Sequence, residues 1–344
     1  MEEKKGKPSI DRGLEEMNFS LVKEVEISGI FIWKSIEDID KVYIPTLKMP
    51  FLSGHLFLSL YEASQGIERL QKIIVELILY AKKYSEDEKK NANNLLKSHY
   101  HTGLNDWILR NKGEIKFSAD ANRLFNILEK FYNNVRYSRY SYSDDISQEV
   151  TLFLEFGKDC EKNDYNNRSL KRLYGKALGE ISRKYYKLIE KISNELNIYV
   201  YEIPYEYPTS IVFLDYYDNN LYDALQKINV SKKELFYYLT QNHFSFNKEN
   251  LLDKMKTINF DSSMINSYLE EIITNRNSST ELFSFVSEHY DEMVKNNKKS
   301  WKERIGIIDV LIANTSSFFL DDDENEDDNL AEEDYNFFDT NDEL

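Results

Sequence analysis

One long apolar stripe constrains this chain more than any other feature of its sequence. Between Ser53 and Lys83, apolar residues recur at alternating spacings of four and three, which places them on one face of an α-helix. The stripe consists of Leu56, Leu60, Ala63, Ile67, Leu70, Ile74, Leu77 and Ala81. The 344 residues include only 11 glycines and 5 prolines, which also favours helices. The sequence therefore predicts a mainly α fold with the helix 53–83 as its strongest element.

The chain exceeds the usual size of a single hydrophobic core, so we expect more than one folded part. We expect an N-terminal segment over 1–50, a helical bundle over 51–145, and a larger, mostly helical domain over 146–320. A few short strands are expected within this plan, at 21–33, 199–203 and 210–214. The remaining residues, 321–344, form a separate tail.

The acidic charge of the chain is concentrated in that tail. Residues 321–344 hold 13 of the 60 acidic side chains and no lysine or arginine. Such a block repels itself and is expected to be disordered. Its aromatic residues, Tyr335, Phe337 and Phe338, are typical of a short motif that docks on a partner protein. Three roles stay open for the tail: a docking motif, a cover that imitates phosphate at a nucleic-acid site, or a solvating segment.

Several functional classes are disfavoured by what the sequence lacks. It has no apolar run of transmembrane length and no secretory signal, so we expect a cytoplasmic protein without a membrane contact. A single cysteine, Cys160, excludes an intrachain disulfide. His99 and His101 have no further histidine or cysteine nearby, so we expect no metal site. No phosphate-binding glycine loop or hydrolase motif is present, so we expect no cofactor.

Three short motifs follow one another within 51–145. The helix 53–83 carries an aromatic residue, a glutamine, an acid and a lysine, spaced four, three and four apart, at Tyr61, Gln65, Glu68 and Lys72. A His-x-x-Leu sequence follows at 101–104, and the next helix ends in Tyr-x-x-x-Arg-Tyr at 132–137. This order resembles the HEPN superfamily, the higher eukaryote and prokaryote nucleotide-binding helical domains.

The resemblance implies a small helical bundle that forms a homodimer, here through the helix 53–83. It also implies a setting in prokaryotic antiviral defence or a toxin–antitoxin system. Many HEPN proteins are metal-independent ribonucleases in which an arginine is followed by a histidine after four to six residues. No arginine of this chain has a histidine at that spacing. The resemblance therefore favours a non-catalytic binding or assembly protein and leaves enzyme activity open.

The main alternative is a metal-independent endoribonuclease of a variant type. In that case Arg136 and Arg139 would stabilise the charged phosphate transition state, and Glu68 or His101 would act as acid or base. A third hypothesis is an adaptor that recruits a partner protein through its tail.

Arginines and tyrosines alternate at the end of the last motif. Arg136 and Arg139 lie three apart, on one helix face, and are interleaved with Tyr137 and Tyr140. Arginine matches phosphate oxygens and tyrosine stacks on bases, so this group predicts a contact with RNA or a partner protein. The competing interpretation is that the tyrosines close the end of the bundle and that the arginines pair with nearby acids.

The helix 168–191 is basic and includes Lys171, Arg172, Arg183 and Lys184. An exposed basic face there would bind a phosphate backbone with salt-sensitive affinity. A solvated face, or a docking site for the acidic tail, is the alternative.

Overall fold

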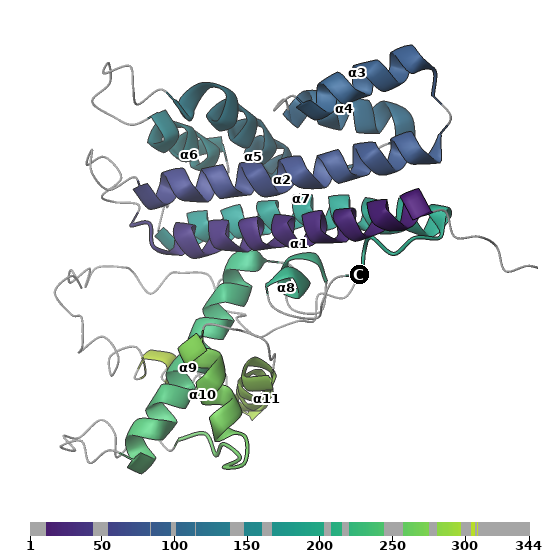
Figure 1. The fold of residues 1–344 in the computed structure, drawn as a ribbon. Helices are drawn as coiled ribbons and strands as arrows, with labels where there is room; N and C mark the ends of the chain where they lie inside the picture. Colours follow the sequence, from purple (N-terminus) through teal and green to yellow (C-terminus); the bar gives the residue numbers. More distant parts are fainter. Residues whose placement is uncertain are drawn as a thin grey trace, which may run out of the picture. The chain divides into compact units, whose positions relative to one another are not determined.

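The computed structural model describes residues 12–43, 54–82, 84–97, 101–113, 115–137, 148–159, 167–202, 208–214, 220–243, 257–274, 281–296, 304–306 and 308. All regular elements in these ranges are helices, which confirms the predicted mainly α fold (Figure 1). The chain divides into two compact units, Met1–Tyr222 and Asp223–Leu344, which we call unit 1 and unit 2.

Unit 1 is built on three long helices that run side by side (Figure 1). They are α1 (Arg12–Asp40), α2 (Gly54–Ala81) and α7 (Asn167–Leu196). Shorter helices surround them: α3 (Glu86–Lys97), α4 (His101–Lys112), α5 (Ala119–Lys130), the π-helical turn η2 (Phe131–Val135), α6 (Gln148–Asp159) and α8 (Thr209–Phe213). The boundary expected at residue 145 falls inside this unit, because α7 packs against both α1 and α2.

The predicted helix 53–83 is the central helix of unit 1. As α2 it contacts α1, α3, α4, α5, η2, α6 and α7. Its apolar stripe is buried except at its last residue, Ala81. The other seven residues have no exposed surface: Leu56, Leu60, Ala63, Ile67, Leu70, Ile74 and Leu77. These seven side chains are therefore covered within the unit, and the expected homodimer stays a prediction.

Helix α1 covers residues 21–33, so the strand expected there is wrong. Leu21, Val25, Ser28, Ile32 and Ser35 are buried at helical spacing along α1. The serines hide this stripe in the sequence, because they stand where apolar residues are expected. Packing of α1 against α2 outweighs the local strand preference of the β-branched residues between them.

The two other expected strands are also wrong within the described residues. Residues 209–213 form the short helix α8, which packs against α1 and α7. Residues 199–202 form turns after the end of α7. A strand is stable only beside a neighbouring strand with which it pairs. The described part of unit 1 contains only helices, so these segments have no strand to pair with.

Buried hydrogen bonds join the three long helices. The Ser59 hydroxyl donates to the Ser35 carbonyl at 2.9 Å, and the Ser35 and Tyr174 hydroxyls lie 2.7 Å apart. The Gln71 side chain donates to the Tyr185 hydroxyl at 3.0 Å. Burial raises the pKa of Tyr174 to about 12, so its hydroxyl stays protonated. These bonds satisfy polar groups that would otherwise destabilise the core.

Unit 2 contains most of α9 (Leu221–His243), together with α10 (Ile265–Thr274) and α11 (Glu281–Asn296). Its apolar core includes Leu235, Phe260, Tyr268 and Val286. A buried ion pair crosses this core, where Arg304 donates twice to Glu234 at 2.7 Å. The two parallel bonds compensate the cost of taking both charges out of water.

Close approach of α1 and α2 depends on Gly66. A Cβ atom at this position would lie 2.6 Å from Ile32 Cγ1 and 3.0 Å from the Ser28 carbonyl oxygen. We expect Gly66→Ala to lower the free energy of unfolding by about 1–2 kcal/mol, since overpacking outweighs the better helix propensity of alanine. Urea unfolding followed by circular dichroism measures this change.

Gly54, at the start of the same helix, is the matched control. A Cβ atom there would have no neighbour within 4 Å, so Gly54→Ala is expected to leave stability almost unchanged. Equal unfolding midpoints for the two variants would contradict this account of the α1–α2 contact.

Candidate functional site

The residues of the three sequence motifs gather in one place in unit 1. Tyr61 and Gln65 lie on α2, Tyr132 lies in η2, and His101 begins α4. The rings of Tyr61 and Tyr132 are stacked with their centres 6.3 Å apart, and the Gln65 side chain donates to the Tyr132 hydroxyl at 2.6 Å. The sequence predicted these positions from motifs far apart in the chain, and the fold brings them into contact.

Arg136 completes this group. Its guanidinium carbon lies 4.0 Å from the ring centre of Tyr132 and 4.5 Å from that of Tyr137. Both are cation–π distances, so the guanidinium contacts the rings of two tyrosines. Tyr137 is 64 % exposed, so much of this residue is in contact with solvent. We call Tyr61, Gln65, Tyr132, Arg136 and Tyr137 the tyrosine–arginine cluster.

A π-helical turn sets the direction of Arg136. In η2 the backbone N–H of Arg136 donates to the Phe131 carbonyl, five residues earlier, at 3.0 Å. The wider turn shifts the following residues around the helix axis relative to ordinary α-helical winding. Such turns are uncommon and occur often at functional sites.

The candidate acid and base groups lie inside the unit. His101 is 1 % exposed, and its ring packs edge-on against Phe125 and Tyr132. Glu68 is buried and pairs with Lys72 at 2.6 Å. Burial raises the pKa of Tyr132, and the nearby Glu68 charge raises it further, so the phenol stays protonated at neutral pH.

The basic face expected on α7 is interrupted by burial. Lys171 is buried and donates to the Asp40 carbonyl at 2.7 Å, and burial lowers the pKa of its ammonium group. Arg183 is also buried, with Nη2 directed at the Ile211 carbonyl. Lys184 pairs with Glu180 at 2.6 Å, while Arg172 is half-buried. Lys171 and Arg183 therefore serve packing within unit 1 and do not form an exposed phosphate-binding face.

The remaining predicted site residues lie outside the described residues. They are Arg139 and Tyr140 beyond η2, and Tyr335, Phe337 and Phe338 in the tail.

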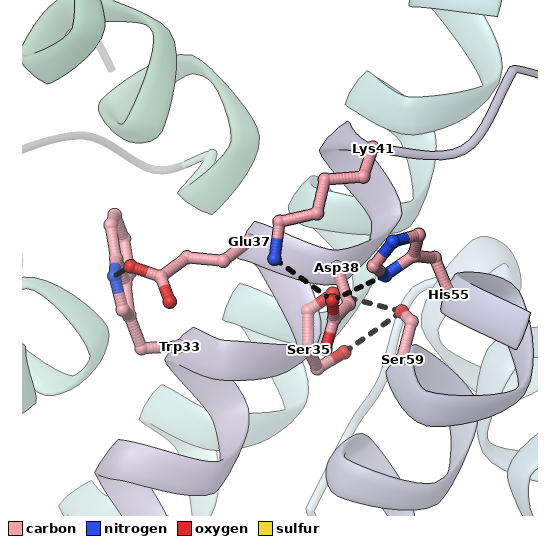
Figure 2. Close-up of polar contacts among 7 residues, drawn as sticks. All are labelled: Trp33, Ser35, Glu37, Asp38, Lys41, His55 and Ser59. Carbon is pink, nitrogen blue, oxygen red and sulfur yellow. Dashed lines mark hydrogen bonds and ion pairs between the residues drawn. The ribbon is translucent and has the colours of Figure 1, made fainter.

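A second polar group lies between the end of α1 and the start of α2, and sequence reasoning missed it (Figure 2). Its centre is Asp38, whose side chain is only 12 % exposed. The Lys41 ammonium lies 3.1 Å from Asp38 Oδ1, and His55 Nδ1 lies 2.8 Å from the same oxygen. On the neighbouring turn of α1, Trp33 donates to Glu37 at 2.9 Å.

Glu62 on α2 belongs to the same group. Burial raises its pKa to about 7, and the neighbouring carboxylate of Asp38 contributes to the rise, against an opposing effect of Lys34. Near neutral pH the Glu62 carboxyl is therefore only partly ionised. Motif reasoning had no signal for this pair, because Asp38 and Glu62 are brought together only by the packing of α1 on α2.

Metal binding and membrane insertion find no support in the described part of the chain. Among those residues, no three or more histidine, cysteine or acidic side chains are placed to share a metal ion. None of the described helices has the length and apolar character needed to span a membrane. Comparison with models of known protein families, with curated proteins and with solved structures found no match.

The raised pKa of Glu62 predicts a pH-dependent stability. Its ordinary pKa is 4.5, and the folded value is about 7. Between these values the unfolded chain releases the Glu62 proton while the folded chain keeps it, so this group's stabilising contribution is lost as pH rises from about 4.5 to about 7. Glu62→Gln mimics the protonated form. We expect its stability relative to wild type to rise by about 1–3 kcal/mol between pH 5 and pH 8.

Urea unfolding midpoints at the two pH values measure this difference. Glu16→Gln is the control, because Glu16 is an exposed acid on α1. Parallel pH profiles for wild type and Glu62→Gln would show that Glu62 does not hold a proton in the folded chain.

Proposed function

We propose that this protein is a non-catalytic RNA-binding and assembly component that acts as a homodimer in the cytoplasm, in a prokaryotic defence or toxin-type system. The setting comes from the resemblance of the motifs in 51–145 to the HEPN superfamily. The RNA contact is the part that the site geometry supports best, and it is placed at the tyrosine–arginine cluster.

The observation that supports this proposal best is the contact of the Arg136 guanidinium with the rings of both Tyr132 and Tyr137. Stacking fixes the plane of the guanidinium and lowers the entropy lost when its N–H groups meet phosphate oxygens. The exposed ring of Tyr137 offers a face on which an unpaired base can stack. Together they match the two parts of a nucleotide in single-stranded RNA.

Burial of the acid and base candidates favours binding over cleavage. A general base must come within hydrogen-bond reach of the ribose 2′-hydroxyl. Both His101 and Glu68 are at most 5 % exposed, so neither reaches an RNA strand without a rearrangement of α2 and α4. This arrangement supports the non-catalytic proposal over the variant endoribonuclease.

The first test is Arg136→Ala in the full-length chain. We expect it to weaken binding of a short, fluorescently labelled single-stranded RNA about tenfold or more, and to reduce the salt dependence by about one phosphate contact. Fluorescence anisotropy at two salt concentrations measures both effects. Tyr137→Ala should also weaken binding, whereas Tyr137→Phe should not, because the ring face rather than the hydroxyl is used.

Arg123→Ala is the matched control for charge. Arg123 lies on α5, the helix that leads into η2, and pairs with Asp120 at 3.4 Å. Its loss should leave affinity within about twofold, as expected for a surface ion pair. Equal effects of Arg123→Ala and Arg136→Ala would reject the cluster as the binding site.

Two other outcomes would favour the alternative functions. RNA cleavage without metal, abolished by Arg136→Ala, would favour the variant endoribonuclease. Binding to a protein and not to RNA would favour the adaptor.

The acidic tail is proposed to gate RNA binding or to recruit a partner. Its 13 acidic residues oppose association with a polyanion, so removal of 321–344 should strengthen RNA binding at low salt and change it little at high salt. Anisotropy titrations of the shortened chain measure this. Unchanged affinity at low salt would remove gating and leave recruitment as the tail's proposed role.

A further inference from the structure

The outward face of α1 gathers exposed apolar side chains. Phe19 is 61 % exposed, Ile30 37 % and Ile27 36 %. Lys23, which is exposed, and Glu26, which is half-buried, lie among them on the same side of the helix. We call these five residues the α1 face. Apolar side chains that gather on one exposed face are typical of an interaction surface.

The α1 face is complementary to itself. An antiparallel second copy of α1, related by a two-fold axis that crosses the helix between Glu24 and Val25, exchanges position 23 with 26 and position 19 with 30. Lys23 then lies opposite Glu26 of the partner subunit. Phe19 lies opposite Ile30 of the partner subunit, and symmetry repeats each contact. Opposite charges meet, and apolar side chains meet, without any like-charge pair between these positions.

Tyr199 extends the same surface. Its backbone N–H donates to Asn18 Oδ1 at 2.8 Å, which places it beside the start of α1, and it is 54 % exposed. The same two-fold axis would bring it toward the segment after Ile30 of the partner subunit. This addition matters, because the contact between positions 19 and 30 spans only about 17 Å of helix and stable interfaces need more area.

We propose that the α1 face is the interface of a two-fold symmetric homodimer of this chain. The inference rests on the homodimer of the proposed function and names its surface. It assigns the contact to α1, since the apolar stripe of α2 is buried within unit 1. The charges favour a second copy of this chain as the partner. The two-fold axis places Lys23 opposite Glu26 of the partner subunit, and Glu26 opposite Lys23 of the partner subunit.

A pair of charge reversals in the full-length chain tests the interface. Lys23→Glu places acids at 23 and 26, and Glu26→Lys places lysines at both positions. Each variant alone sets like charges opposite each other twice, so we expect self-association to weaken about tenfold or more. Mixed in equal amounts, each variant meets the opposite charge on the other, and a dimer with one copy of each should form. One of the two variants carries an affinity tag, so that native mass spectrometry distinguishes the mixed dimer from both homodimers by its mass.

Mixing the two charge variants distinguishes a change at the dimer interface from a change in the folding of a single chain. Lys23 and Glu26 are also three apart on one helix, so each variant alone could change helix stability. Mixing cannot repair a defect within one chain. Ile30→Ser should weaken dimers as well, while Leu58→Ser should not, because Leu58 is an apolar residue of similar exposure on α2 outside the α1 face.

Two outcomes would overturn the proposal: a wild-type chain that stays monomeric at micromolar concentration, or charge variants that dimerise alone and gain nothing by mixing. The RNA titration is read separately. A monomer that binds RNA through Arg136 rejects the interface and keeps the RNA function. A dimer that responds to the α1 variants but binds no RNA keeps the interface and rejects the RNA function.

Discussion

Burial of α2 on nearly every side is the constraint on which unit 1 depends. A helix surrounded by protein must find partners for its own polar side chains, because water cannot supply them. Ser59 and Gln71 meet this demand by bonding to other helices, and those bonds also fix how far each neighbour can slide. Tyr61, Glu62 and Gln65 lie where α2 is only partly covered. The tyrosine–arginine cluster and the polar group around Asp38 each include residues from this stretch.

Periodicity predicted the helices that carry unbroken apolar stripes, and it failed where polar residues interrupt them. α2 was predicted almost to its ends because its stripe contains only apolar residues. α1 was missed because Ser28 and Ser35 occupy core positions, where Ser28 donates to the Glu24 carbonyl one turn earlier and Ser35 shares a hydrogen bond with Tyr174 on α7. The division after Tyr222 was also beyond local patterns, since it follows from which helices α7 contacts.

The candidate site was predictable in part, for a similar reason. Short motifs identified Gln65, Tyr132 and Arg136, and the fold places them in contact. Composition alone could not tell an exposed cation from a buried one, so Lys171 and Arg183 were assigned to a surface that they do not occupy. Asp38 and Glu62 had no motif to mark them, because a raised pKa arises from packing between two helices and not from spacing along one.

The π-helical turn has a consequence for how this chain tolerates changes in length. A π-helical turn holds one residue more than the corresponding α-helical turn. Deleting one residue from η2 would restore ordinary winding and leave the parts on either side of the turn in nearly the same orientation, because the extra residue is accommodated within the turn. If the deleted residue is Asn133 or Asn134, Arg136 comes to stand three residues after Tyr132 instead of four, which changes how its guanidinium meets that ring. Among related chains, the residue count between Phe131 and Arg136 is therefore as informative about this site as the arginine itself.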